Sequence, residues 1–192
     1  MNLPNKITIS RIGLAFLFMF FLFSKGLSAR YLAFFTFLLA SFTDLIDGKL
    51  ARRRNEITTF GKLVDPIADK ILVLAAFLGF VELRLVPAWM VVLIIVRELI
   101  ITGLRLTAAN KGIIIEASRG AKHKTVSQMS AIFLILGVLA IKETLLRYTT
   151  LWTGEYEKCF NLSVLIIMSV TVLFTLGSGI TYLIKNKRLF LK

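Results

Sequence analysis

The chain has 192 residues, of which 57% are hydrophobic, and it carries a formal net charge of +13. This apolar content exceeds that of ordinary soluble domains and favours an integral membrane protein. The basic residues gather at the ends of apolar stretches, which indicates contact with anionic lipid head groups and excludes a typical nucleic-acid-binding domain.

Six apolar stretches follow one another, each long enough, or nearly so, for a helix that crosses a bilayer. The period-2 alternation of barrel strands is not seen. The amphipathic segment Met1–Arg11 predicts a short interfacial entry to the first helix. No linker divides the sequence, so we expect a single domain over residues 1–192, an all-α integral membrane protein with six transmembrane helices. The stretches are residues 7–23, 31–49, 62–81, 87–108, 126–141 and 160–184.

The first stretch also resembles a signal peptide, because Lys6 and Arg11 precede its apolar part and Ser28-Ala29 follow it. Leu27 is a poor residue for the outer small position of a cleavage site. We therefore expect this stretch to be retained as a membrane anchor.

The distribution of basic residues predicts the orientation in the membrane. If the N-terminus is cytoplasmic, sixteen of the 24 Lys and Arg residues lie in or next to the segments on the cytoplasmic side. Six lie on the other side, and Lys70 and Arg97 lie within spans. This asymmetry predicts a multi-pass protein of the cell membrane with both termini in the cytoplasm. It places residues 44–69 on the same side.

Four aspartates flank the turn between the second and third stretches. Asp44 and Asp47 are three residues apart, and Asp65 and Asp69 are four apart, so each pair shares a helix face. Antiparallel helices joined by a short loop would bring the pairs together, and four such carboxylates would repel one another. Acids within a membrane indicate a functional site. Two divalent cations, Mg²⁺ or Mn²⁺, are the simplest positive partner for these oxygen ligands.

The residues between the pairs suit phosphate chemistry. Gly48 lets a ligand approach the backbone, Arg52 offers a planar fork of donors, and Thr58 supplies a hydroxyl. For any single residue the alternative is a solvated helix end with glycines that only pack. The complete string disfavours that alternative: it reads D-x-x-D-G-x-x-A-R, then eight residues, then G-x-x-x-D-x-x-x-D.

This string resembles the signature of the CDP-alcohol phosphatidyltransferases, with each defining position matched. The resemblance implies a six-helix membrane enzyme, commonly a homodimer, whose site opens to the cytoplasm and holds two divalent cations. It implies transfer of a phosphatidyl group from a CDP-linked lipid to an alcohol, with release of CMP. The implied roles are metal ligation by Asp44, Asp47 and Asp65, general base and metal contact by Asp69, and nucleotide or pyrophosphate contacts by Gly48, Arg52 and Thr58.

Further patches resemble the bacterial phosphatidylglycerophosphate synthases, a branch of that family. They cover residues 2–129, about two thirds of the chain, and imply CDP-diacylglycerol and sn-glycerol 3-phosphate as substrates. Two departures concern local geometry: Ala121 stands where a glycine usually precedes the lysine pair, and a proline usual in the first span is absent. The patches are residues 2–8 with Arg11, Arg97-Glu98, residues 102–105, residues 122–125 and Gln128-Met129.

Basic residues near the fourth and fifth stretches fit an anionic acceptor. Arg105, Lys122 and Lys124 lie at the cytoplasmic ends, where a phosphate ester would arrive. Arg97 lies about ten residues inside the fourth stretch and needs a partner. Glu98 projects about 100° away around the helix, so we expect the partner to be the acceptor phosphate or one of the aspartates. The alternatives are ordinary positive-inside charge for the lysines and an interhelical ion pair for Arg97.

The sequence thus favours synthesis of phosphatidylglycerophosphate and CMP, with Asp69 taking the proton from the glycerol hydroxyl. Sibling enzymes that use inositol phosphate, serine or phosphatidylglycerol are the nearest alternative. A divalent-cation transporter is the alternative from another class, but its polar residues would be spread over several spans. A single histidine and a single cysteine give little support to zinc chemistry.

Overall fold

The computed structural model describes residues 3–54, 59–110, 119–149 and 152–187. Side chains are described for residues 10–43, 70–109, 123–149 and 152–187. Within these ranges the regular structure is entirely helical, which confirms the all-α prediction. The helices are α1 (Leu3–Phe23), α2 (Leu27–Arg54), α3 (Thr59–Glu82), α4 (Ala88–Asn110), α5 (Arg119–Tyr148) and α6 (Gly154–Asn186).

Each predicted apolar stretch coincides with one helix, but several helices are longer than their stretches. The helix α5 extends seven residues beyond the predicted span 126–141 at each end. Hydropathy measures the apolar part of a helix, whereas backbone hydrogen bonding continues into polar flanks. At the amino end, α1 begins at Leu3 and runs without a break through Arg11. The described part of the predicted interfacial segment, from Leu3 to Arg11, is therefore continuous with the first helix.

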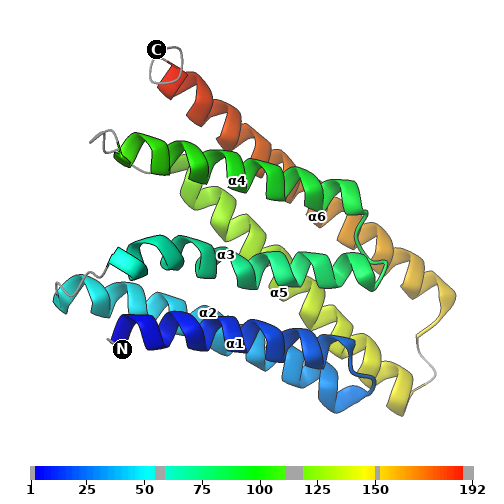
Figure 1. The fold of residues 1–192 in the computed structure, drawn as a ribbon. Helices are drawn as coiled ribbons and strands as arrows, with labels where there is room; N and C mark the ends of the chain where they lie inside the picture. The colour runs from blue at the N-terminus through cyan, green and yellow to red at the C-terminus, as the bar shows by residue number, and fades with distance from the viewer. Residues whose placement is uncertain (1–2, 55–58, 111–118, 150–151, 188–192) are drawn as a thin grey trace.

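The six helices run back and forth along one bundle (Figure 1). The N-terminus, the ends of α2 and α4 and the end of α6 lie toward the same side of the picture. Residues 24–26 connect α1 to α2 at the opposite side, where Gly26 has a φ of 106°. That left-handed conformation costs glycine little and most other residues more, so Gly26 suits this tight turn.

Aromatic side chains fill much of the bundle core. Phe18 on α1 and Phe37 on α2 are fully buried, and their ring centroids lie 5.4 Å apart. Phe37 also makes an edge-to-face contact with Phe133 on α5, with centroids 5.1 Å apart. Phe77 and Phe80 bury the adjoining face of α3. These contacts join the first three helices and α5 around one apolar core.

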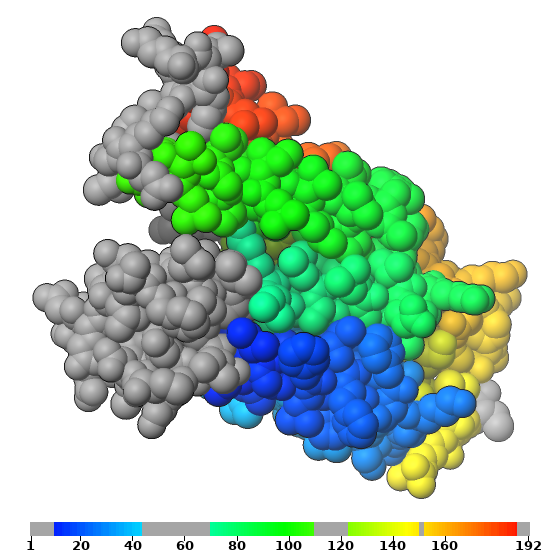
Figure 2. Space-filling model, in the orientation of Figure 1, coloured from blue at the N-terminus to red at the C-terminus, as the bar shows by residue number. Residues whose placement is uncertain are grey.

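Large apolar side chains also cover the outside of the bundle, as expected where lipid replaces water. Phe16 is 71% exposed and Leu173 is 70% exposed. In Figure 2 the side chains of α1, α3 and α4 lie beside one another on the face toward the viewer. In the described part of the chain, two segments are long and apolar enough to cross a membrane: His123–Tyr148 and Gly154–Asn186. Ser10–Phe23 and Leu27–Thr43 are shorter apolar helical segments.

A polar cluster joins α5 and α6 near their connection. Lys142 contacts Glu157 at 2.6 Å, and the indole N–H of Trp152 donates to the same carboxylate at 2.7 Å. Nearby, the hydroxyls of Tyr31 and Thr144 are 3.0 Å apart and join α2 to α5. These contacts lie at the end of α5 remote from Lys124, so they stabilise the bundle away from the polar pocket described next.

Candidate active site

The aspartate string occupies the end of α2 and the start of α3. Asp44, Asp47, Gly48 and Arg52 fall within α2, and Asp65 and Asp69 fall within α3. The two helices are separated by only four residues, 55–58, which include Thr58. Their separation in sequence is therefore short enough for the predicted antiparallel turn. The side chains of this string lie outside the described residues, so their individual roles stay predictions.

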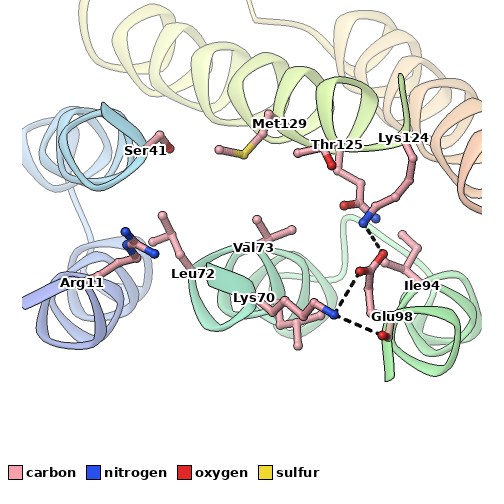
Figure 3. A pocket seen from close by; sticks show the side chains of 12 residues that line it. Arg11, Ser41, Lys70, Leu72, Val73, Ile94, Glu98, Lys124, Thr125 and Met129 are labelled. Carbon is pink, nitrogen blue, oxygen red and sulfur yellow. Dashed lines mark hydrogen bonds and ion pairs between the residues drawn. The ribbon is translucent and has the colours of Figure 1, made fainter. Parts of the chain in front are cut away.

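A polar pocket begins where the string ends. Lys70, the residue after Asp69, lines a cavity of about 90 Å³ between the helices. Arg11 from α1 and Ser41 from α2 lie across the cavity from Glu98 of α4 (Figure 3). The lining thus combines residues of five helices. Its other members are Leu72, Val73, Leu74, Ile94, Lys124, Thr125, Gln128 and Met129.

Glu98 is the carboxylate that three of the described basic residues around this pocket share as a partner. Its side chain is only 8% exposed, and its carboxylate forms an ion pair with the buried ammonium group of Lys124 from α5. The ammonium group of Lys70 from α3 lies 3.5 Å from the other carboxylate oxygen and donates to the backbone carbonyl of Glu98 at 3.1 Å. Lys70 also donates to the hydroxyl of Thr102. One carboxylate therefore joins lysines of two other helices (Figure 3).

Arg97 finds partners that the sequence analysis did not predict. Its guanidinium donates to the carboxylate of neighbouring Glu98 at 3.1 Å and to the hydroxyl of Ser178 on α6 at 2.8 Å. The expectation that Glu98 points too far away was wrong, because an arginine side chain is long enough to fold across to the adjacent position. Gly179 leaves room for this path: a Cβ there would lie 3.0 Å from Cγ of Arg97.

The other predicted acceptor-binding residues separate in space. Lys124 lines the pocket. Arg105 is not among the lining residues; its guanidinium carbon lies 5.3 Å from the ring centroid of Tyr182 on α6. The side chain of Lys122 lies outside the described residues. The structure therefore brings Lys124 and Arg97 together through Glu98 and places Arg105 in a separate contact between α4 and α6.

Lys70 is the pocket residue that the motif analysis passed over. In the sequence it was noted only as a basic residue within a span. A cation in an apolar helix is itself a signal of function. Its position directly after Asp69 adds a second signal, because it places an ammonium group one residue beyond the aspartate string.

The donor chemistry of the string fits divalent cations. Among the described side chains there is no group of three His, Cys, Asp or Glu residues able to hold a metal ion. The four aspartates fall on helices adjacent in sequence and supply only carboxylate oxygens, which suit Mg²⁺ or Mn²⁺. If a metal is bound, its ligands are therefore expected from Asp44, Asp47, Asp65 and Asp69.

Comparison with known proteins gives one consistent result. Residues 1–176 match the family model described as CDP-alcohol phosphatidyltransferase. Three similar curated proteins carry the name CDP-diacylglycerol--glycerol-3-phosphate 3-phosphatidyltransferase. The protein of Bacillus subtilis is 42% identical over 147 residues, or 70% of this chain and 76% of the relative. That of Rickettsia bellii is 34% identical over 189 residues, or 98% and 97%. That of Rickettsia typhi is 41% identical over 137 residues, or 71% and 77%.

Proposed function

Because this chain belongs to the CDP-alcohol phosphatidyltransferase family, we propose that it makes phosphatidylglycerophosphate. It transfers the phosphatidyl group of CDP-diacylglycerol to sn-glycerol 3-phosphate and releases CMP. The names of relatives at 34–42% identity support this reaction, which belongs to phospholipid biosynthesis. The structural observation that carries the choice of acceptor is the pocket directly beyond Asp69, where lysines from two helices converge.

The aspartate string supplies the groups for the transfer step. Asp69 accepts the proton of a glycerol hydroxyl, and the hydroxyl oxygen attacks the lipid-side phosphorus of CDP-diacylglycerol. The bond from that phosphorus to the bridging oxygen breaks, and the electron pair leaves with CMP. Arg52, Gly48 and Thr58 hold the nucleotide and the pyrophosphate. Two divalent cations held by Asp44, Asp47, Asp65 and Asp69 would offset the negative charge of the pyrophosphate.

The acceptor phosphate is proposed to bind at the lysines of the pocket. Lys124 has the best support, because its ammonium group is held at the cavity by Glu98. Arg105 lies near the C-terminal end of α4 and Lys122 lies near the N-terminal end of α5. Both would attract the phosphate as it arrives. Arg97 contributes indirectly, because its guanidinium already donates to Glu98 and Ser178 and is not proposed to contact the phosphate.

The chain is also proposed to form one membrane domain with six spans, cytoplasmic termini and a cytoplasmic active site. Two candidate spans and the apolar side chains that cover the bundle support membrane insertion. The described residues form an even number of helices, and the N-terminus and the end of α6 lie toward one side in Figure 1. Both observations support a shared location for the termini. The excess of basic residues at that side supports the cytoplasmic orientation. The family resemblance supports a homodimer in the cell membrane.

The reaction can be tested with the purified protein in detergent or in vesicles. We expect CMP release from CDP-diacylglycerol to require sn-glycerol 3-phosphate and a divalent cation, and the lipid product to carry the added phosphate. Inositol phosphate, serine and phosphatidylglycerol are the comparison acceptors. Faster turnover with one of these would reassign the acceptor within the family. Movement of a divalent cation across vesicles without CMP release would overturn the enzyme assignment itself.

Replacing Lys124 with Gln should weaken use of the acceptor. A charge-assisted hydrogen bond contributes about 1.5–3 kcal/mol, so kcat/KM for sn-glycerol 3-phosphate should fall roughly ten- to a hundredfold. The KM for CDP-diacylglycerol should change little, because its proposed contacts lie in residues 44–69. Lys158→Gln, outside the pocket lining, is the matched control. An equal fall in kcat/KM for sn-glycerol 3-phosphate and for CDP-diacylglycerol would assign Lys124 a structural role.

A further inference from the structure

Glu98 is an acidic residue in the wall of a pocket proposed to bind an anion. It is among the pocket's described lining residues and is largely buried. A carboxylate repels a phosphate, so its presence there needs a function. We propose that Glu98 is a positioning residue that holds the ammonium groups of Lys70 and Lys124 at the pocket for the acceptor phosphate. This inference rests on the proposed function, because it concerns the same reaction.

The contacts of the two lysines show why a carboxylate is suited to this task. Lys124 is 8% exposed, and the partner that the structure gives it in the described part of the chain is Glu98. A buried ammonium group without a counter-charge is strongly disfavoured. Lys70 comes from another helix, and its ammonium group reaches both the carboxylate and the backbone carbonyl of Glu98. Without the carboxylate, the two cations would repel each other and turn away.

The position of Glu98 is in turn supported from α6. Arg97 binds the same carboxylate oxygen as Lys124, while its other terminal nitrogen binds Ser178. Neither Ser178 nor Arg97 is among the pocket-lining residues. A chain of contacts therefore leads from α6 through Arg97 to Glu98 and ends at the lysines in the cavity. It orients the lysines without placing α6 in contact with the acceptor.

The charge balance leaves the cluster ready for a phosphate. Among the described side chains of this cluster, Lys70, Arg97 and Lys124 carry three positive charges and Glu98 carries one negative charge. The excess is positive, and a phosphate monoester carries about −1.5 to −2 near neutral pH. Each lysine ammonium group has three donors. Lys124 can therefore keep its contact with Glu98 and still donate to a phosphate oxygen, while Lys70, whose donors already contact Glu98 and Thr102, supplies positive charge.

Replacing Glu98 with Gln tests the proposal, since glutamine keeps the shape and removes the charge. We expect the KM for sn-glycerol 3-phosphate to rise roughly tenfold, while the KM for CDP-diacylglycerol stays within about twofold. Glu98→Asp keeps the charge and should recover part of the loss. The matched control is Glu157→Gln, which breaks the 2.6 Å contact with Lys142 elsewhere on α5 and α6. It should leave both KM values unchanged.

A double variant separates positioning from an independent effect of the charge. In Lys124→Gln protein, adding Glu98→Gln should raise the acceptor KM by less than about threefold more, because the main positioned group is already gone. This double variant removes both members of the buried pair, so it also serves if Glu98→Gln alone does not fold. Thermal unfolding in detergent is measured for each variant.

Three results would overturn the proposal. The acceptor KM could be unchanged in Glu98→Gln, or it could fall because the carboxylate competes with the phosphate in the unmutated protein. In the double variant, the increase in acceptor KM could equal the product of the increases caused by the two single substitutions. These results differ from failure of the proposed function. If the proposed function fails, even the unmutated protein, with Glu98 in place, would not use sn-glycerol 3-phosphate.

Discussion

Asp65→Asn is expected to abolish phosphatidyl transfer while the protein still inserts and folds, and Asp44→Asn should do the same. Each substitution removes a negative charge and an oxygen ligand from the proposed metal site. Charge stabilisation by bound metal is worth several kcal/mol in a transition state. At about 1.4 kcal/mol for each factor of ten, the rate should fall by at least about a hundredfold. CMP release at saturating Mg²⁺ measures the effect.

Glu82→Gln is the matched control for Asp65, because it changes an acid of the same helix at its other end. Its activity should equal that of the unmutated protein. Retained folding of the aspartate variants is checked by size-exclusion chromatography and thermal unfolding in detergent. Near-normal activity of either Asp44→Asn or Asp65→Asn would contradict the metal-site proposal. All four aspartates of the sequence belong to this string. No aspartate elsewhere in the chain is therefore present to replace a lost metal ligand.

Asp69→Asn should lower turnover more than it weakens binding of CDP-diacylglycerol. A general base acts in the transition state and typically contributes about 10²–10⁴ in rate. The donor lipid is held by Arg52 and the remaining carboxylates, so its binding is largely formed in the ground state. We therefore expect kcat to fall by at least about a hundredfold, with a change of only a few fold in donor KM. Steady-state kinetics with both substrates give the two values.

The same kinetics distinguish a base from a ligand. Asp69→Asn and Asp65→Asn are compared at increasing Mg²⁺ concentration, because a lost ligand is partly compensated by more metal whereas a lost base is not. A defect of Asp69→Asn that is confined to the donor KM would exclude the role as base. A full recovery at high Mg²⁺ would assign it to metal binding alone.

Several features could be determined from the sequence because each depends on local pattern. Apolar stretches of membrane length predicted the helices, since hydrophobic length and helix rise are properties of one segment. The string from Asp44 to Asp69 predicted the family, because its spacing places each chemical group along two consecutive helices. The comparisons confirm that assignment. The fourth stretch was predicted to begin at residue 87, and α4 begins at the next residue, Ala88.

The composition of the pocket was decided by the tertiary structure. Lys70, Glu98 and Lys124 are separated by more than twenty residues from one to the next, and no local pattern indicates that their side chains meet. The same holds for Arg97 and Ser178, which are 81 residues apart. Such contacts depend on which face each helix turns toward its neighbours. In helices that are apolar on most sides, hydropathy contains little information about those faces, so only the packing of α3, α4, α5 and α6 established the cluster.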